Sequence, residues 1–339
     1  MRCLIRADAS EAIGTGHVMR CLTIAEELTA RGHEVVLRGS VENVAWLEAR
    51  IIEAGVTVES VPPGTMSTRA ADYEGIEMMI IDSYTIPADA ITAANRIVPV
   101  MLVIDGDGRG ADATRYLDQN LGADGGSLSP TQRRRLLAGP RYALVRKEIV
   151  ALRRPDVREI SGRPRICAFM GGSDPTGAMV TVAGALEALS VPADIDLVVT
   201  DRWRDAVTAR AGRLEGVRVH PPTPRLPHLL AAADVAVSAT GTSAWDVCTL
   251  GVPAVFAAVV DNQRAGFAAL MHEGLALGVD LSTSTDAEAD LTAAVERLLD
   301  DAPLRRRLFA ACADLFDGRG AARVADQVEA LAAGLRAGG

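Results

Sequence analysis

The chain of 339 residues is long enough for about two domains, and 49% of its residues are hydrophobic and 23% charged, as in globular proteins. A net charge of −9 and a pI near 5.2 argue against a nucleic-acid-binding protein, which normally carries a basic face. No apolar run approaches the roughly 20 residues that span a bilayer, and no signal-peptide pattern is visible. Five scattered cysteines without metal-like spacing fit buried, reduced thiols. We therefore expect a cytoplasmic protein without a membrane span.

Apolar strand candidates alternate with helical patterns along the chain. Several strands are apolar throughout, which is typical of a parallel sheet that helices cover on both faces. In chain order, the first half is expected to hold strands at 2–7, 34–38, 56–61, 77–82 and 98–105, with helices such as 44–54 and 88–96 between them. The second half is expected to hold strands at 165–170, 195–200, 217–220, 235–238 and 254–258, with helices at 178–189, 226–233 and 287–299.

Each half begins with a strand, a glycine loop and a helix, and a polar segment at 151–164 separates the halves. This pattern predicts an α/β fold of two Rossmann-like domains that face a central cleft. We expect the first domain at 1–150, a linker at 151–164 and the second domain at 165–330.

The first glycine loop contains Gly14, Gly16 and His17 and precedes a helical pattern at 22–28. Free backbone N–H groups and the helix dipole favour an anion at such a loop. A lone histidine more often caps a helix or packs in a loop. In this loop, however, His17 is placed to move protons near neutral pH, which indicates a catalytic base. Asp8 follows the first strand and could orient His17 or a sugar hydroxyl.

A second loop of small and hydroxyl residues follows the strand at 235–238. It predicts a diphosphate pocket, because small residues allow close backbone approach and hydroxyls can donate. Asp246, about one turn into the next helix, could accept hydrogen bonds from a ribose diol. An ordinary N-cap at Thr242 and a favourable first-turn charge at Asp246 are equally open alternatives. The pocket residues are Ala239, Thr240, Gly241 and Thr242.

Further polar groups follow other expected strands, where α/β sheets bind ligands. Gly171, Gly172 and Ser173 follow the first strand of the second half, and Asn262 and Gln263 follow its last predicted strand.

In the first half, Asp82 and Tyr84 could line the same cleft, or form a turn with a packed tyrosine. Asp105-Gly106-Asp107 is similar to the Asp-x-Asp metal site of some glycosyltransferases, but acidic turns are common. We expect no metal and no other cofactor.

The ordered motifs resemble a known family. Arg6-x-Asp8-x-Ser10 followed by Gly14-x-Gly16-His17-x-x-Arg20 is similar to the N-terminal signature of the UDP-sugar hydrolases of pseudaminic acid biosynthesis, whose relatives include the spore coat polysaccharide protein group. Further matches, which extend the resemblance over nearly the whole chain, are Asp82-Ser83-Tyr84, Gln119-Asn120, Gly139-x-x-Tyr142-x-Leu144-x-Arg146, Gly171-Gly172-Ser173-Asp174-Pro175, Ser238-Ala239-x-Gly241-Thr242, Gly251-x-Pro253, Asn262-Gln263 and Asp317-Gly318-x-Gly320.

The resemblance implies a GT-B-like fold, shared with the glycosyltransferase that makes lipid II. It implies that the second domain binds the nucleotide and that His17 of the first domain is the base. Two departures concern specificity. Asp246 stands where the family usually has a ribose-binding glutamate, and Gly106 separates aspartates that the family tends to have side by side.

We therefore expect a hydrolase that cleaves a nucleotide-diphospho-sugar, a UDP-sugar, at the anomeric carbon. The alternative is a metal-independent GT-B glycosyltransferase that moves the sugar to an acceptor hydroxyl or amine, and a non-enzymatic nucleotide-sugar sensor is a third hypothesis. The expected catalytic residues are His17, Asp8 and Tyr84. The expected nucleotide-binding residues are Gly171, Gly172, Ser173, Ala239, Thr240, Gly241, Thr242, Asp246 and Gln263. The expected sugar-binding residues are Arg6, Gly14, Gly16, Asp82, Asp105 and Asn262.

Overall fold

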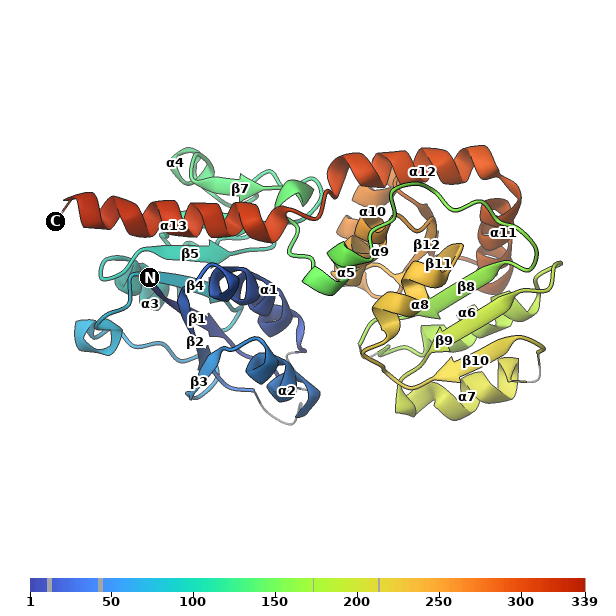
Figure 1. Ribbon diagram of the computed structural model, residues 1–339, viewed down its shortest axis with the longest axis horizontal. Coiled ribbons are helices and arrows are strands. Elements are labelled where there is room, and N and C mark those ends of the chain that lie inside the picture. Colours follow the sequence, from blue (N-terminus) through green and yellow to red (C-terminus); the bar gives the residue numbers. More distant parts are fainter. Residues whose placement is uncertain (11–13, 42–44, 173, 213, 339) are drawn as a thin grey trace. The chain divides into compact units, whose positions relative to one another are not determined.

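A computed structural model describes residues 1–10, 14–41, 45–172, 174–212 and 214–338, which form two compact units (Figure 1). The first unit, called the first domain below, contains Met1–Val145 and Gly318–Gly339, and the second domain contains Arg146–Asp317. Each domain has a parallel sheet with helices between most successive strands. The predicted α/β fold of two Rossmann-like domains is confirmed.

The first sheet has its strands in the order β3-β2-β1-β4-β5-β6-β7. The order reverses between β1 and β4, which pair directly, with Ala7 beside Asp82. Ligands of open α/β sheets bind at the carboxyl ends of the strands at such a switch point. The strands are β1 (Arg2–Ala7), β2 (Glu34–Gly39), β3 (Thr57–Ser60), β4 (Met78–Asp82), β5 (Val100–Val103), β6 (Arg115–Asp118) and β7 (Leu136–Ala138).

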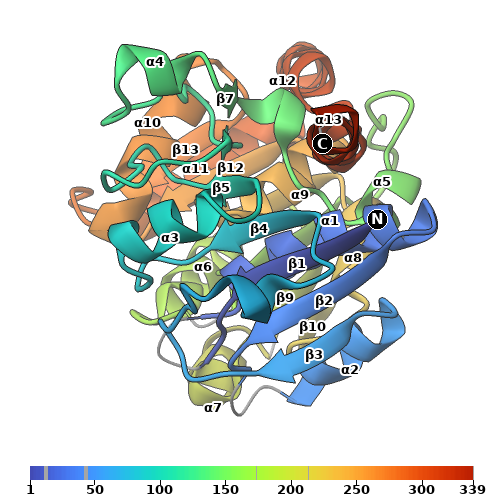
Figure 2. The same cartoon turned by 90° about the vertical axis from the view of Figure 1, so that its left-hand side faces the viewer.

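Alternate residues of β1 face two separate cores because side chains of a strand point to opposite faces of the sheet. Ile5 packs in the core that contains α1 (Gly16–Ala30) and α13 (Gly320–Gly338), whereas Leu4 packs in the core that contains α3 (Ala88–Asn95). Figure 2 shows α1 and α3 on opposite sides of β1 and β4. The shorter elements of this domain are α2 (Ala45–Glu53), α4 (Pro130–Arg133), and the 3₁₀ turns η1 (Ala70–Tyr73) and η2 (Pro140–Tyr142).

The second sheet repeats the arrangement with strand order β10-β9-β8-β11-β12-β13 and a switch point between β8 and β11. Its strands are β8 (Arg165–Phe169), β9 (Asp194–Val198), β10 (Val217–His220), β11 (Val235–Ala239), β12 (Ala254–Ala258) and β13 (Leu277–Asp280). Its helices are α5 (Lys147–Ala151), α6 (Ala178–Glu187), α7 (Asp201–Ala211), α8 (Leu226–Ala232), α9 (Ser243–Leu250), the 3₁₀ turn η3 (Asp261–Gln263), α10 (Arg264–His272), α11 (Ala287–Asp300) and α12 (Ala302–Leu315).

The C-terminal helix α13 returns to the first domain, so the expected end of the second domain at residue 330 does not match the structure. Val324 and Val328 are fully buried in the first core, against α1. Arg31, just after α1, donates to Asp326 at 2.7 Å and to Glu329 at 2.8 Å. The apolar face of α13 is buried by packing against α1, and the order of elements along the chain does not reveal this contact.

The expected linker at 151–164 is likewise part of the second domain. Arg154 anchors this segment: its backbone N–H donates to the carbonyl of Leu250 at 3.2 Å, and its guanidinium donates to the carbonyl of Ala231 at 2.9 Å. The polar composition of the segment therefore reflects surface attachment through arginines rather than a free connection.

Replacing Val328 by aspartate is expected to destabilise the first domain by about 3–5 kcal/mol, because the new carboxylate would be buried without a partner. The matched control is Ala330→Asp, which adds the same carboxylate at an exposed position of the same helix. Urea unfolding of both variants measures the difference. Equal midpoints would contradict the placement of α13.

All five cysteines are free and buried, as the sequence predicts. Burial raises the pKa of the Cys3 thiol to about 12, so this thiol is unreactive near neutral pH. Within the described residues, no helix combines the length and the apolar character that crossing a membrane requires.

Candidate functional site

A polar cluster lies where β1 and β4 end, at the switch point of the first sheet. The loop after β1 leads into α1, which begins at Gly16, so His17 sits in the first turn of this helix. Asp82 is the last residue of β4 and pairs with Ala7 of β1. The strand order thus brings together two residues that are 65 positions apart in the chain.

His17 and Asp82 form a hydrogen-bonded pair. Nδ1 of His17 lies 2.6 Å from Oδ1 of Asp82, whose side chain is only 1% exposed. Arg20 also donates to this carboxylate, so the carboxylate is the acceptor and the imidazole must donate through Nδ1. The tautomer then leaves the Nε2 lone pair free to take a proton, which is the arrangement of an oriented general base.

Arg20 bridges the carboxylates of Asp82 and Asp105. Its Nε and Nη2 donate to Asp82, and Nη1 and Nη2 each donate to Asp105 at 3.0 Å. The Arg20 side chain is only 7% exposed, and its interactions with the two aspartates raise its pKa further despite burial. Sequence reasoning gave Arg20 no role. The spacing of His17 and Arg20, three residues apart on one helix face, was the available signal.

Asp105 is saturated by its neighbours. Besides Arg20, it accepts hydrogen bonds from the Tyr84 hydroxyl and from Nδ2 of Asn120, at 2.7 Å for the latter. Burial alone would raise the pKa of Asp105, but Arg20, Tyr84 and Asn120 outweigh it and hold the pKa at about 2. Asp105 therefore stays ionised and holds Arg20, Tyr84 and Asn120 in place, and its contact with a sugar stays a prediction.

Tyr84 stands beside His17. Its ring meets the His17 ring edge-on with centroids 4.6 Å apart, and 58% of the residue is exposed. Burial of its hydroxyl and the charge of Asp105 raise the pKa of Tyr84, so the phenol stays protonated. Arg109 fixes the loop after β4 by donating to the carbonyls of Ser83 at 2.5 Å and Ile86 at 3.3 Å. Tyr84 is therefore suited to contact a ligand and to donate, and not to act as a base.

Asp8 and Arg6 contact each other and backbone groups of the segments at 38–40 and 62–65, and not His17. Asp8 accepts from Arg6 at 2.6 Å and from the backbone N–H groups of Ser40 and Gly64, each at 2.9 Å. The partner that orients His17 is Asp82, so the expectation that Asp8 orients it is not supported. Arg6 is 2% exposed and donates to the carbonyls of Pro62 and Thr65.

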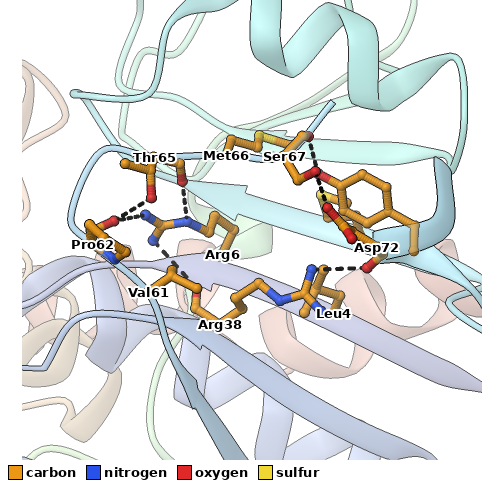
Figure 3. Close-up of a pocket in the computed structure, with 11 residues that line it drawn as sticks. Leu4, Arg6, Arg38, Val61, Pro62, Thr65, Met66, Ser67 and Asp72 are labelled. Atoms are coloured by element: carbon orange, nitrogen blue, oxygen red, sulfur yellow. Dashed lines mark hydrogen bonds between the residues drawn. The ribbon is translucent and has the colours of Figure 1, made fainter. Parts of the chain in front are cut away.

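Arg6 also lines a cavity of about 470 Å³ beneath the loop at 61–67 (Figure 3). The cavity borders Leu4 and Met79, which belong to the core on the α3 side of the sheet. The close-up shows the Arg6 guanidinium turned toward Pro62 and Thr65. The donors of Arg6 thus hold this loop, and the expected contact of Arg6 with a sugar stays a prediction.

The glycines of the first loop leave space above the backbone. Gly14 has φ +84°, which favours glycine, and a Cβ built on Gly14 or Gly16 would meet nothing within 4 Å. Backbone approach by a ligand, as the sequence predicts, is therefore sterically open at both positions.

The aspartates at 105 and 107 do not converge on a metal. Asp105 is bound as described, and Asp107 accepts from the Ser127 hydroxyl at 2.5 Å and from the Arg109 backbone at 2.7 Å. Among the described residues, no group of three or more His, Cys, Asp or Glu side chains is arranged to hold a metal ion.

In the second domain, the loops after β8 and β11 meet at the switch point. Gly171 has φ +76°, and a Cβ built on Gly172 or Gly241 would meet nothing within 4 Å, so a ligand can approach this backbone. Thr242 precedes α9 as its N-cap, but its side chain makes no capping hydrogen bond. The N–H groups of Ala244 and Trp245 already donate to the carbonyls of Gly241 and Thr242. The open backbone at Gly241 and the positive dipole end of α9 are therefore the features that suit a diphosphate.

Other predicted residues of this domain have different surroundings. Thr240 is 4% exposed and donates through its N–H and hydroxyl to the carbonyl of Ala257, and Ala239 is 6% exposed. Gln263 accepts from the Val259 N–H at 3.0 Å and so fixes its own loop. Ser173 lies outside the described residues, as does the side chain of Asn262.

Asp246 faces Arg146, a contact that sequence reasoning missed. Nη2 of Arg146 donates to Oδ2 of Asp246 at 3.0 Å, and Nη1 donates to Glu148 at 3.1 Å. Burial raises the pKa of Asp246, and the charge of Arg146 opposes this rise. Arg146 occurs in a motif of the family resemblance, which was the available signal.

Comparison with known proteins gives a relative that covers nearly the whole chain. The chain is 23% identical over 328 residues to the spore coat polysaccharide biosynthesis protein SpsG of Bacillus subtilis, covering 94% of this chain and 95% of that protein. No family model matches.

Among solved structures, MurG of Acinetobacter baumannii superposes with a TM-score of 0.68 at 15% identity, over 97% of this chain and 99% of MurG. The glycosyltransferase of kitacinnamycin gives 0.69 at 20% identity, over 97% and 98%. The calicheamicin glycosyltransferase CalG4 gives 0.68 at 16%, over 98% of both chains. The fold is that of the GT-B glycosyltransferases. The fold expectation is thereby confirmed, whereas specificity for a pseudaminic acid precursor is not.

Proposed function

We propose that this protein is a glycosyltransferase that moves a sugar from a nucleoside diphosphate to an acceptor hydroxyl or amine, with His17 as general base. The observation that carries the proposal is the His17–Asp82 pair, which fixes the tautomer with Nε2 available. The similarity to transferases of the same fold and to a polysaccharide biosynthesis protein supports transfer over the hydrolysis expected from the sequence motifs.

In the proposed reaction, Nε2 of His17 takes the proton of the acceptor as its oxygen or nitrogen attacks the anomeric carbon. The bond from this carbon to the β-phosphate oxygen breaks, and the nucleoside diphosphate leaves. The imidazolium that forms is stabilised by Asp82, to which it is hydrogen-bonded at 2.6 Å. An oriented pair of this kind needs no reorganisation when charge develops.

The second domain supplies the nucleotide site in this proposal. The open backbone at Gly241 and the positive dipole end of α9 stabilise the diphosphate as its negative charge grows. The neighbour SpnG was solved with thymidine diphosphate, at 16% identity and a TM-score of 0.64, which supports a nucleoside diphosphate as the ligand class.

Incubation of the purified protein with nucleotide-sugars, with and without candidate acceptors, separates the hypotheses. Product that forms only with an acceptor supports transfer. Rapid release of free sugar without acceptor supports the hydrolase expected from the sequence, since His17 could equally deprotonate water. Tight nucleotide binding without turnover of any sugar would support a sensor and contradict both enzymatic readings.

We expect Asp246→Asn to weaken UDP binding by about tenfold, because one charge-assisted hydrogen bond contributes roughly 1.5–3 kcal/mol. Thymidine diphosphate lacks the ribose 2′-hydroxyl, so its affinity should fall less. Calorimetric titration of both nucleotides measures the difference. The control is Asp261→Asn, which changes an exposed carboxylate of the same domain. Equal losses for UDP and thymidine diphosphate would contradict a ribose contact.

A further inference from the structure

The sheet edge around His17 carries an excess of negative charge. Arg20 of α1 and three segments after β4, β5 and β6, residues 82–87, 104–110 and 118–133, together carry five carboxylates and three guanidiniums. These segments stop before the chain reaches the amino ends of β6 and β7. With His17 neutral, this leaves two formal negative charges among the described residues of this edge. The carboxylates are Asp82, Asp105, Asp107, Asp118 and Asp124, and the guanidiniums are Arg20, Arg109 and Arg133.

The guanidiniums of this edge are engaged with the protein itself. Arg20 binds Asp82 and Asp105. Arg109 donates to two carbonyls of the loop at 83–86. Arg133 donates to the carbonyls at positions 126 and 128, at 2.8 and 3.0 Å. A phosphate or carboxylate of a ligand would have to displace one of these contacts to gain a cationic partner.

Two carboxylates of the segment after β5 face solvent, and the first of them, Asp105, contacts Tyr84 beside His17. The side chain of Asp105 is 27% exposed. It accepts a hydrogen bond from the hydroxyl of Tyr84, whose ring contacts the His17 ring. Asp107 is exposed, and hydrogen bonds from Ser127 and the Arg109 backbone lower its pKa. Both carry full negative charge near neutral pH, so an approaching anion is repelled and a cation attracted.

We propose that the molecule whose hydroxyl or amine reaches His17 is uncharged or cationic near its reacting end, and that carboxylated or phosphorylated acceptors are excluded. This inference rests on the proposed function for the identity of the site. It follows from the charge balance of the edge and from the engagement of Arg20, Arg109 and Arg133 with protein acceptors. Charge complementarity acts mainly through selectivity and encounter rate.

Alkylation of His17 tests the inference without knowledge of the acceptor. Nε2 attacks the methylene carbon of iodoacetamide, which is neutral, or of iodoacetate, which is anionic, and iodide leaves in both reactions. Mass spectrometry of the peptide with His17 gives both rates, and N-acetylhistidine in the same tube gives the reference ratio. We expect the ratio of iodoacetate to iodoacetamide at His17 to be about tenfold below the reference.

Two charge-matched variants locate the cause. Asp107→Asn should raise the ratio at His17 about two- to threefold. Asp112→Asn should leave it unchanged, because Asp112 pairs with Arg135 just before β7, at the amino end of the strands. A ratio equal to the reference, or equal effects of the two variants, would overturn the inference and leave the proposed function standing. Failure of both reagents to modify His17 would overturn the proposed function and this inference together.

Discussion

Replacing His17 by alanine should lower kcat by about 10²- to 10⁴-fold, the usual contribution of a positioned general base. Nucleotide affinity should change little, because the groups proposed to bind the nucleotide belong to the second domain. The measurement is the release of nucleoside diphosphate at saturating donor and acceptor, together with calorimetric titration of the nucleotide. The control is His33→Ala, which removes another partly buried histidine of the first domain that is paired with a carboxylate, Glu329.

The substitution Asp82→Asn tests whether Asp82 sets the tautomer of His17 or only packs against its ring. An asparagine amide can donate to Nδ1, which would place the proton on Nε2 and abolish the base, as in serine proteases when the aspartate of the triad is replaced. We expect a loss of kcat comparable to that of His17→Ala, and no further loss in the double variant. Near-normal turnover of His17→Ala, or additive effects of the two substitutions, would contradict the pair as the catalytic unit.

The parts of the fold that depend on local sequence could be predicted. β1 has the expected bounds, and the apolar runs that became β4 and β12 reflect burial on both faces of the sheets. The short strands β6, β7 and β13 were not predicted, since three or four residues with polar members give no clear period. The destination of α13 also depends on a contact with α1, some 295 residues away, that no local pattern encodes.

In the candidate site, too, local sequence predicted some features, whereas others depend on contacts between distant segments. The glycine loop identified His17 because the strand, glycines and helix start are contiguous in the chain. Asp8, which is near in sequence, was expected to orient His17 or a sugar hydroxyl. The structure places Asp82 against His17, because Asp82 ends β4 and β4 pairs with β1 at the switch point. Strand order is a property of the whole sheet, so a residue's neighbour across it cannot be read from spacing.

Arg20→Met should destabilise the first domain by about 3–5 kcal/mol, because the side chain keeps its approximate length while two carboxylates lose their shared cation. Urea unfolding followed by the fluorescence of Trp46 measures this, since Trp46 is the only tryptophan in residues 1–145, in a background with Trp203 and Trp245 replaced by phenylalanine. Arg96→Met, at the end of α3, removes an arginine of the same domain as a control.

The pH dependence of this effect distinguishes lost charge pairing from lost packing. In the wild type, the lowered pKa of Asp105 contributes stability that is present above its ordinary value of 3.8 and is lost as the pH falls toward about 2. Without Arg20, burial and the neighbouring carboxylate should raise the pKa of Asp105 above that value. The folded variant would then take up a proton more readily than the unfolded chain. Its stability should therefore recover toward that of the wild type as the pH is lowered from 8 to 5, whereas a packing defect would give a difference that does not change with pH.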